Sequence, residues 1–173
     1  MSWRSLPSKK THAHTFGCRG RPYRRNSSSS CCGPYRDWAT FATSRVKSLA
    51  LARGFSETAS GELVHYAGNG PPDFVIRRFN DAPGRPANNA YYSGLTFALD
   101  LPQVADPPGA LQRMVDLAEG FARDLGGELV DDNRRPLTEA GIANLRRSLD
   151  RIAQDMESQG IPAGSALARR LFT

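Results

Sequence analysis

Two carboxylates and two guanidinium groups lie close together in residues 131–135, which read Asp131-Asp132-Asn133-Arg134-Arg135. A pair of acids could act in general base catalysis or bind a divalent cation. Adjacent residues of a strand point to opposite faces, however, so the two acids would not easily serve one centre. We therefore interpret this cluster as a hydrogen-bonded turn braced by ion pairs, and we expect the protein not to be an enzyme.

The other residues that could carry chemistry lack a productive spacing. His12, His14 and Cys18, with Cys31-Cys32, do not follow a zinc-ligand pattern. No glycine-rich loop has the spacing of a phosphate-binding motif at the start of a helix. His65 stands alone in a predicted strand, with no nucleophile paired to it in the sequence. We therefore expect no metal site, no cofactor and no small-molecule substrate.

Two predicted helices flank the acidic and basic cluster and must position it. Residues 107–125 carry apolar side chains at steps of three and four, with Asp106 as the expected N-cap and Gly126 as the expected stop. Residues 139–159 repeat the same steps, and Thr138 is the expected N-cap. Both helices should therefore present one apolar face to a common core.

The remaining elements indicate an α+β fold. A short helix is predicted for residues 44–53, and the best strand pattern is the alternation over residues 94–101. The strand–helix–strand order of residues 94–132 is typical of a split β-α-β unit. We expect an antiparallel sheet with helices packed on one face, which leaves its other face open to solvent or a partner. The predicted strands cover residues 62–66, 74–79, 94–101 and 128–131.

The open face of the sheet is the candidate binding surface. If Phe74 and Ile76 face the core, the alternate residues of the same strand face outward. Such a surface of small, apolar and cationic side chains could accept an amphipathic peptide that carries some acid. A merely solvated sheet face is the alternative. The outward residues are Val75, Arg77, Phe79, Thr96 and Ala98.

Charge divides the chain into a basic head and a slightly acidic remainder. Residues 1–47 hold ten Lys or Arg and one Asp, a net charge of +9, whereas the remainder holds thirteen basic and sixteen acidic residues, a net charge of −3. We predict a basic, disordered head over residues 1–43 and a folded domain over residues 44–173. A misassigned start of the reading frame is the other explanation of the head.

The basic head keeps a second class of function open. A basic-tailed nucleic-acid-binding protein with an RNA-recognition-like sheet would use Arg77, Arg78 and Phe79 on RNA. The chain contains no apolar run of about 18 residues, and its first residues lack the apolar stretch of a secretory signal. We therefore expect neither a membrane anchor nor a secretory signal in this chain.

Two segments carry a family resemblance. Residues 94–102, GLTFALDLP, followed by residues 125–138, LGGELVDDNRRPLT, resemble the C-terminal domain of ZipA. The ending, with Gly160-Ile161-Pro162-Ala163-Gly164-Ser165 and Arg170-Leu171-Phe172, is similar to ZipA-like proteins of β-proteobacteria. The resemblance covers roughly residues 48–173, and the run from the paired glycines to Thr138 is its most specific part.

The resemblance implies a bacterial cell-division protein that binds the C-terminal tail of FtsZ and supports Z-ring and septum assembly. In that family the tail docks, largely helical, on the open sheet face. An anchor outside that domain holds it to the cytoplasmic face of the inner membrane at the division site. Aligning the strands implies peptide contacts at Arg77, Phe79, Asp81, Thr96 and Ala98.

The chain is expected to differ from the family pattern in three respects, and the first is the absence of the family's membrane anchor. Asp81 and Ala98 stand where better-known members carry a lysine and a bulky aromatic residue. The family also has a strand before its first helix, and residues 20–36, with their Arg, Ser, Gly and Cys, do not resemble a strand. The first strand of the sheet is therefore expected to be missing.

Overall fold

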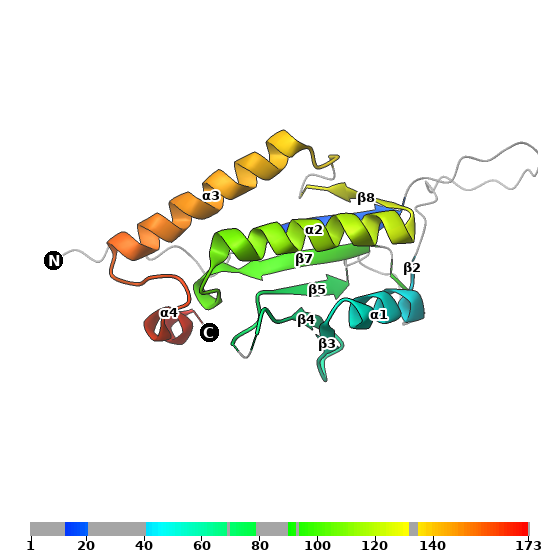
Figure 1. Cartoon of the computed structure of the whole chain (residues 1–173), viewed down its shortest axis with the longest axis horizontal. Helices are drawn as coiled ribbons and strands as arrows, with labels where there is room; N and C mark the ends of the chain where they lie inside the picture. Colours follow the sequence, from blue (N-terminus) through cyan, green and yellow to red (C-terminus); the bar gives the residue numbers. More distant parts are fainter. Residues whose placement is uncertain are drawn as a thin grey trace, which may run out of the picture.

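The computed structural model describes residues 41–68, 70–78, 90–92, 94–131 and 135–172, and the backbone of residues 13–20. Helices and strands within these ranges form an α+β structure, as predicted (Figure 1). The strands are β1 (Ala13–Gly20), β2 (Phe41–Ala42), β3 (Phe55–Glu57), β4 (Leu63–His65), β5 (Phe74–Arg78), β6 (Tyr91–Tyr92), β7 (Gly94–Asp100) and β8 (Gly127–Val130). The helices are α1 (Thr43–Ala52), the 3-10 helix η1 (Leu101–Gln103), α2 (Pro107–Leu125), α3 (Glu139–Ser158) and α4 (Ala166–Leu171).

The main sheet of the described residues has six strands in the order β3-β4-β5-β7-β1-β8, and each neighbouring pair is antiparallel. The predicted antiparallel sheet is therefore confirmed. Because β7 and β8 both run antiparallel to β1, they are parallel to each other, and α2 connects them. This arrangement is the predicted split β-α-β unit, with β1 as the strand inserted into the split. A second, short sheet pairs β2 with β6.

Strand β1 corrects two expectations drawn from the sequence. The first strand is not missing, because β1 pairs with β7 from Ala13 to Arg19 and with β8 from Gly17 to Gly20. The prediction of disorder is consequently wrong for residues 13–20, while residues 1–12 and 21–40 lie outside the described residues. Strand β1 lies almost entirely before residues 20–36, the segment in which the family pattern would place the first strand. Backbone hydrogen bonds from two sides hold it, which no local pattern reveals.

Helix α2 supplies the centre of the core. It begins as predicted at Asp106, whose side chain accepts a hydrogen bond from the Gly109 amide, and it ends at Gly126 in the left-handed conformation. Its amphipathic face buries seven side chains and Pro107. Against this face pack the inward residues of the sheet, including Phe97 and Leu99 of β7 and Phe74 and Ile76 of β5.

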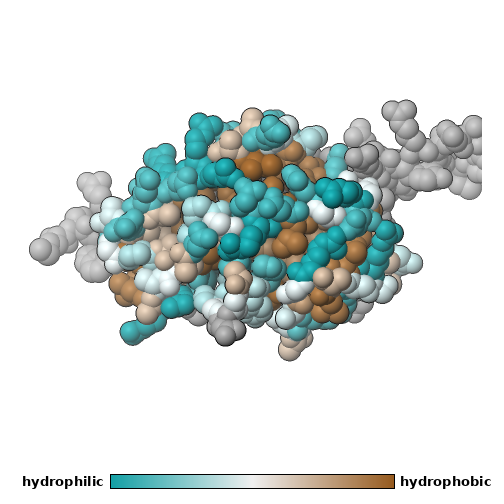
Figure 2. Space-filling view, viewed as in Figure 1, coloured by the Kyte–Doolittle hydropathy of each residue, from teal (hydrophilic) through white to brown (hydrophobic). Residues whose placement is uncertain are grey.

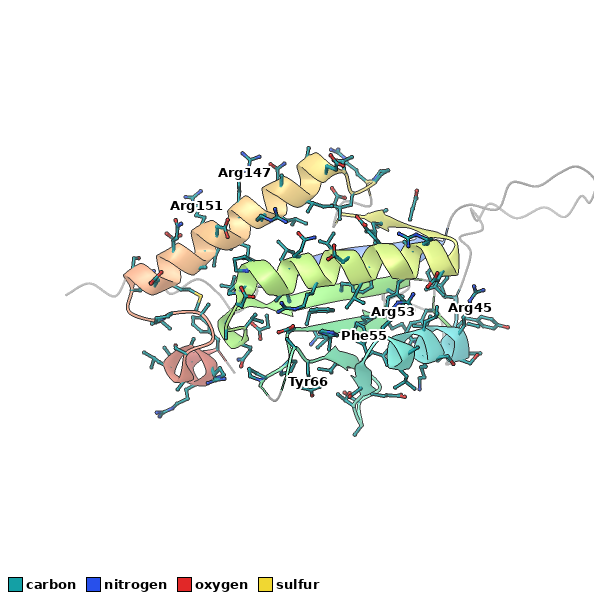
Figure 3. The ribbon with its side chains drawn as sticks, viewed as in Figure 1. Arg45, Arg53, Phe55, Tyr66, Arg147 and Arg151 are labelled. Atoms are coloured by element: carbon teal, nitrogen blue, oxygen red, sulfur yellow. The ribbon has the colours of Figure 1, made fainter. Side chains whose placement is uncertain are left out.

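The helices lie on one side of the sheet, as predicted (Figure 1). Helix α2 contacts β1, β7 and β8, and α3 packs on α2. Arg53, at the end of α1, forms an ion pair with Asp124 and lies 5.0 Å from the centre of the Phe121 ring, so it links α1 to α2 (Figure 3). Arg147 and Arg151 project from the outer side of α3. The helical side is mostly hydrophilic, with hydrophobic groups in separate patches (Figure 2).

Candidate peptide-binding face

Register between the strands places the predicted site residues on one face of the sheet. Val75 of β5 lies opposite Ala98 of β7, and Arg77 lies opposite Thr96. Directly opposed residues of an antiparallel pair project to the same side, so these four share a face. The intervening residue Ile76 is in the core on the helical side, so the four face away from the helices.

Four of the six predicted site residues can be placed. Arg77 is exposed, Val75 and Thr96 are half-buried, and Ala98 is buried, with 6% of its surface accessible. The outward direction predicted for these four residues is therefore confirmed, although their exposure is uneven. Phe79 and Asp81 lie outside the described residues.

The same face extends onto strands that the sequence did not assign to it. Val64 of β4 lies opposite Val75, and Val130 of β8 shares a row with Thr96 through Gly17 of β1. Val64 and Val130 are 4% and 5% exposed, but neither belongs to the core cluster under α2. The outward face therefore carries an apolar band, which we define as Val64, Val75, Ala98 and Val130. The alternation within each strand could have predicted that these residues face outward. Only the register between the strands shows that they lie in line with one another.

The two consecutive arginines of β5 have opposite environments. Arg77 faces outward, and its Nε donates a hydrogen bond of 2.6 Å to a carboxylate oxygen of Glu62, directly before β4. Arg78 is the next residue and lies on the helical side, with its guanidinium 4.5 Å from the centre of the Tyr92 ring. This distance is typical of a cation–π interaction. The outward face thus presents Arg77 but not Arg78, and the predicted RNA surface of Arg77, Arg78 and Phe79 does not form from both arginines.

The cluster at residues 131–135 forms a turn in its described part. The backbone amide of Asp131 donates to the Arg135 carbonyl, and the Arg135 amide donates to the Asp131 carboxylate, both at 2.8 Å. A bridge between Val130 and Pro136 continues the pairing. The hydrogen bonding predicted for this cluster is confirmed between Asp131 and Arg135, and Thr138 caps α3 as expected. Asp132, Asn133 and Arg134 lie outside the described residues.

His65 belongs to a group of polar side chains on the helical side, not to the candidate face. Its Nδ1 lies 3.6 Å from the carboxylate of Asp73, which is buried and also paired with Arg113 of α2 at 3.0 Å. The His65 ring stacks on Phe74 with 4.7 Å between centroids. Burial lowers the pKa of His65, and the Asp73 carboxylate opposes that shift. The group ties the β4–β5 hairpin to α2.

No three His, Cys, Asp or Glu residues of the described chain lie close enough together to hold a metal ion. Within the same residues, no helix is long and apolar enough to cross a bilayer. Of the other metal-capable residues, His14 and Cys18 lie in β1, whereas His12, Cys31 and Cys32 lie outside the described residues.

A sheet that is backed by helices on one side can use its other side to bind a partner. The sequence matches the family model of the ZipA C-terminal FtsZ-binding domain over residues 37–148. This match spans more than half of the chain, so the chain belongs to that family. It is an FtsZ-binding domain of the bacterial division machinery, and the family is one of protein-binding domains, not of enzymes. No curated protein matches the chain significantly.

Proposed function

We propose that this chain binds the C-terminal tail of FtsZ on the outward face of its sheet and thereby supports Z-ring and septum assembly at the division site. The observation that carries the proposal is the register of β5 and β7, which brings Val75, Arg77, Thr96 and Ala98 together opposite the helices. Arg77, Thr96 and Ala98, with Phe79 and Asp81, are the contacts that the family resemblance implies, and Val75 follows from the alternation of β5 alone. The cytoplasmic face of the inner membrane, where family members are anchored, is the expected location.

The chemistry of the face suits an amphipathic peptide segment. On this face Val75 and Thr96 are half-buried and can contact apolar side chains of a helical segment, whereas Val64, Ala98 and Val130 are buried. Arg77 on the same face can pair with an acidic side chain of the same segment. A small site of this kind favours modest affinity, because few large side chains are available as anchors.

Titration of the full chain against a fluorescently labelled FtsZ C-terminal peptide tests this proposal. We expect saturable anisotropy that a scrambled peptide does not reproduce. Thr96→Asp should weaken the affinity about tenfold or more, because it introduces an unpaired carboxylate where the peptide is to bury apolar surface. Ser148→Asp on exposed α3 adds the same charge to the helical side and should leave the affinity unchanged.

Circular dichroism of both variants establishes that each remains folded. Equal affinity of Thr96→Asp and the native chain would place the peptide elsewhere. Absence of saturable binding by the native chain would refute the proposed function itself.

A further inference from the structure

An ion pair lies across the candidate face where the peptide is proposed to bind. Arg77 Nε and Glu62 Oε1 are 2.6 Å apart, and the two side chains are 56% and 36% exposed. Both groups therefore reach solvent on the outward side of the sheet. The cation that would recognise an acidic peptide already has an acidic partner within its own chain.

We propose that Glu62 is a specificity-determining residue that competes with the peptide for Arg77. In the free protein its carboxylate holds the guanidinium, and a bound peptide must present its own carboxylate to replace it. The inference rests on the proposed function, because it concerns the same face. It assigns the site a preference for a peptide with an acidic side chain opposite Arg77, and it makes Glu62 the residue that limits affinity.

Exposure makes the exchange feasible. An ion pair between solvent-exposed side chains contributes little to stability and is screened by salt, so an incoming carboxylate can displace it. Glu62 also repels an approaching acid over a few ångströms, since like charges at such distances disfavour association. Both effects act in the same direction, and removal of the Glu62 charge should remove both.

The position of Glu62 does not depend on its carboxylate. Its backbone amide donates to Thr58 Oγ1 at 3.1 Å, and its carbonyl accepts a hydrogen bond from the Thr58 amide at 2.9 Å. Strands β4 and β5 are joined by their own register from Leu63 to His65. Glu62→Gln should therefore leave the turn and the sheet intact while it releases Arg77.

A second exposed ion pair supplies a matched control. Glu57 pairs with Lys47 of α1 at 2.5 Å, and Glu57 lies opposite Leu63, so it faces the helical side. Glu57→Gln thus makes the same change of charge and breaks a similar pair, but on the other side of the sheet. A general effect of net charge would appear equally in both variants.

The experiment measures the affinity of full-length native, Glu62→Gln and Glu57→Gln proteins for the labelled FtsZ C-terminal peptide, at low and high salt. A second peptide has its acidic residues replaced by the corresponding amides. We expect Glu62→Gln to bind the acidic peptide about two- to fivefold more tightly than the native chain, as release from one exposed ion pair predicts. Glu57→Gln should match the native chain. The gain should shrink at high salt and vanish with the amide peptide.

Each outcome separates this inference from the proposed function. Native binding with no gain in Glu62→Gln, or an equal gain in Glu57→Gln, overturns the role of Glu62 and leaves the proposed function standing. Binding by Glu62→Gln but not by the native chain supports the role of Glu62 and overturns the proposed function of the native chain. Binding by neither protein overturns both.

Discussion

At the scale of single residues, His65 is the described side chain whose protonation should couple most directly to folding. Its ring lies between Phe55 and Phe74, and its Nδ1 is buried without a hydrogen-bond partner. Burial lowers the pKa of His65 from its ordinary value of 6.5, despite the Asp73 carboxylate nearby. The neutral ring is therefore the form that the folded protein favours.

This shift predicts a stability that falls in mild acid. The unfolded chain takes up the His65 proton near pH 6.5, whereas the folded chain resists it to lower pH, so the unfolded state binds more protons in that window. The contribution of the neutral His65 ring to stability is therefore full above pH 6.5. It is lost as the pH falls through 6.5 toward the pKa of His65 in the folded protein. His65→Phe retains the stacking on Phe74 and should remove this component. It should change the free energy of unfolding at pH 8 by no more than about 1 kcal/mol.

Urea unfolding at pH 8 and pH 5.5 measures the difference for both proteins. Groups other than His65 titrate in both the native protein and His65→Phe, so their contributions cancel when the two pH dependences are compared. The same loss of stability on acidification in native protein and His65→Phe would show that His65 does not contribute.

The residue-scale interactions of the candidate face were only partly predictable. Alternation in β5 and β7 correctly assigned Val75, Arg77, Thr96 and Ala98 to the outward side. The Glu62–Arg77 pair was not predicted, because fifteen positions separate the residues in sequence and only the β4–β5 register brings them together. The alternation of β7 likewise assigns Ala98 to the outward side without predicting that only 6% of its surface is exposed.

At the scale of elements, the connection between α3 and α4 depends on a close backbone approach. Gly164 has a φ of +69°, its amide donates to the Pro102 carbonyl at 3.0 Å, and a Cβ there would lie 2.4 Å from Ala105 Cα. This contact holds the start of α4 against η1, where Ala168 is fully buried. Leu167 and Leu171 of the same helix are exposed.

Two glycine substitutions separate the free-energy cost of the left-handed conformation from the cost of the close backbone approach. Gly160 also has a positive φ, of 73°, but nothing lies within 4 Å of its Cβ position. Gly160→Ala should therefore lower the free energy of unfolding by about 1–2 kcal/mol, through the left-handed conformation alone. Gly164→Ala should cost about 1–3 kcal/mol more, because backbone must also move. Urea unfolding of both variants checks this order, and equal losses would contradict the close approach.

Elements with strong local signals were predicted well. Helices α2 and α3 have regular apolar spacing and side-chain caps at Asp106 and Thr138, and these local features fixed both starts. Strand β3 was missed because its three residues are too short for an alternation to be recognised. Strand β1 was missed because its arginine and glycine residues have little intrinsic preference for a strand, and its stability comes from β7 and β8.

At the scale of the whole molecule, β1 places residues 13–20 of the basic head in the main sheet. It lies between β7 and β8, so it joins the two strands of the split β-α-β unit. Removal of residues 1–40 would leave β7 and β8 without their shared neighbour and expose two unpaired edges. Such a deletion therefore cannot separate peptide binding from nucleic-acid binding, since both would change if the sheet were disrupted.

Two deletions test this central role. Removal of residues 1–40 should lower Tm by more than about 10 °C or abolish a cooperative transition, because loss of several kcal/mol shifts Tm by that much in a chain of this size. Peptide binding should be lost with the sheet. Removal of residues 1–11 keeps β1 and should leave both Tm and affinity as in the native chain. Thermal melts followed by circular dichroism, with peptide titration at 20 °C, measure both properties.

A charge variant of the head tests peptide binding against nucleic-acid binding while it keeps β1. Replacement of Arg21, Arg24, Arg25 and Arg36 by Gln lowers the head's charge without altering β1. If the FtsZ tail binds on the outward sheet face, this variant retains peptide affinity, and any oligonucleotide binding by the native chain weakens as its basic residues are removed. A native-like melt after deletion of residues 1–40 would contradict the central position of β1, and the sheet would then have to fold from β3, β4, β5, β7 and β8 alone.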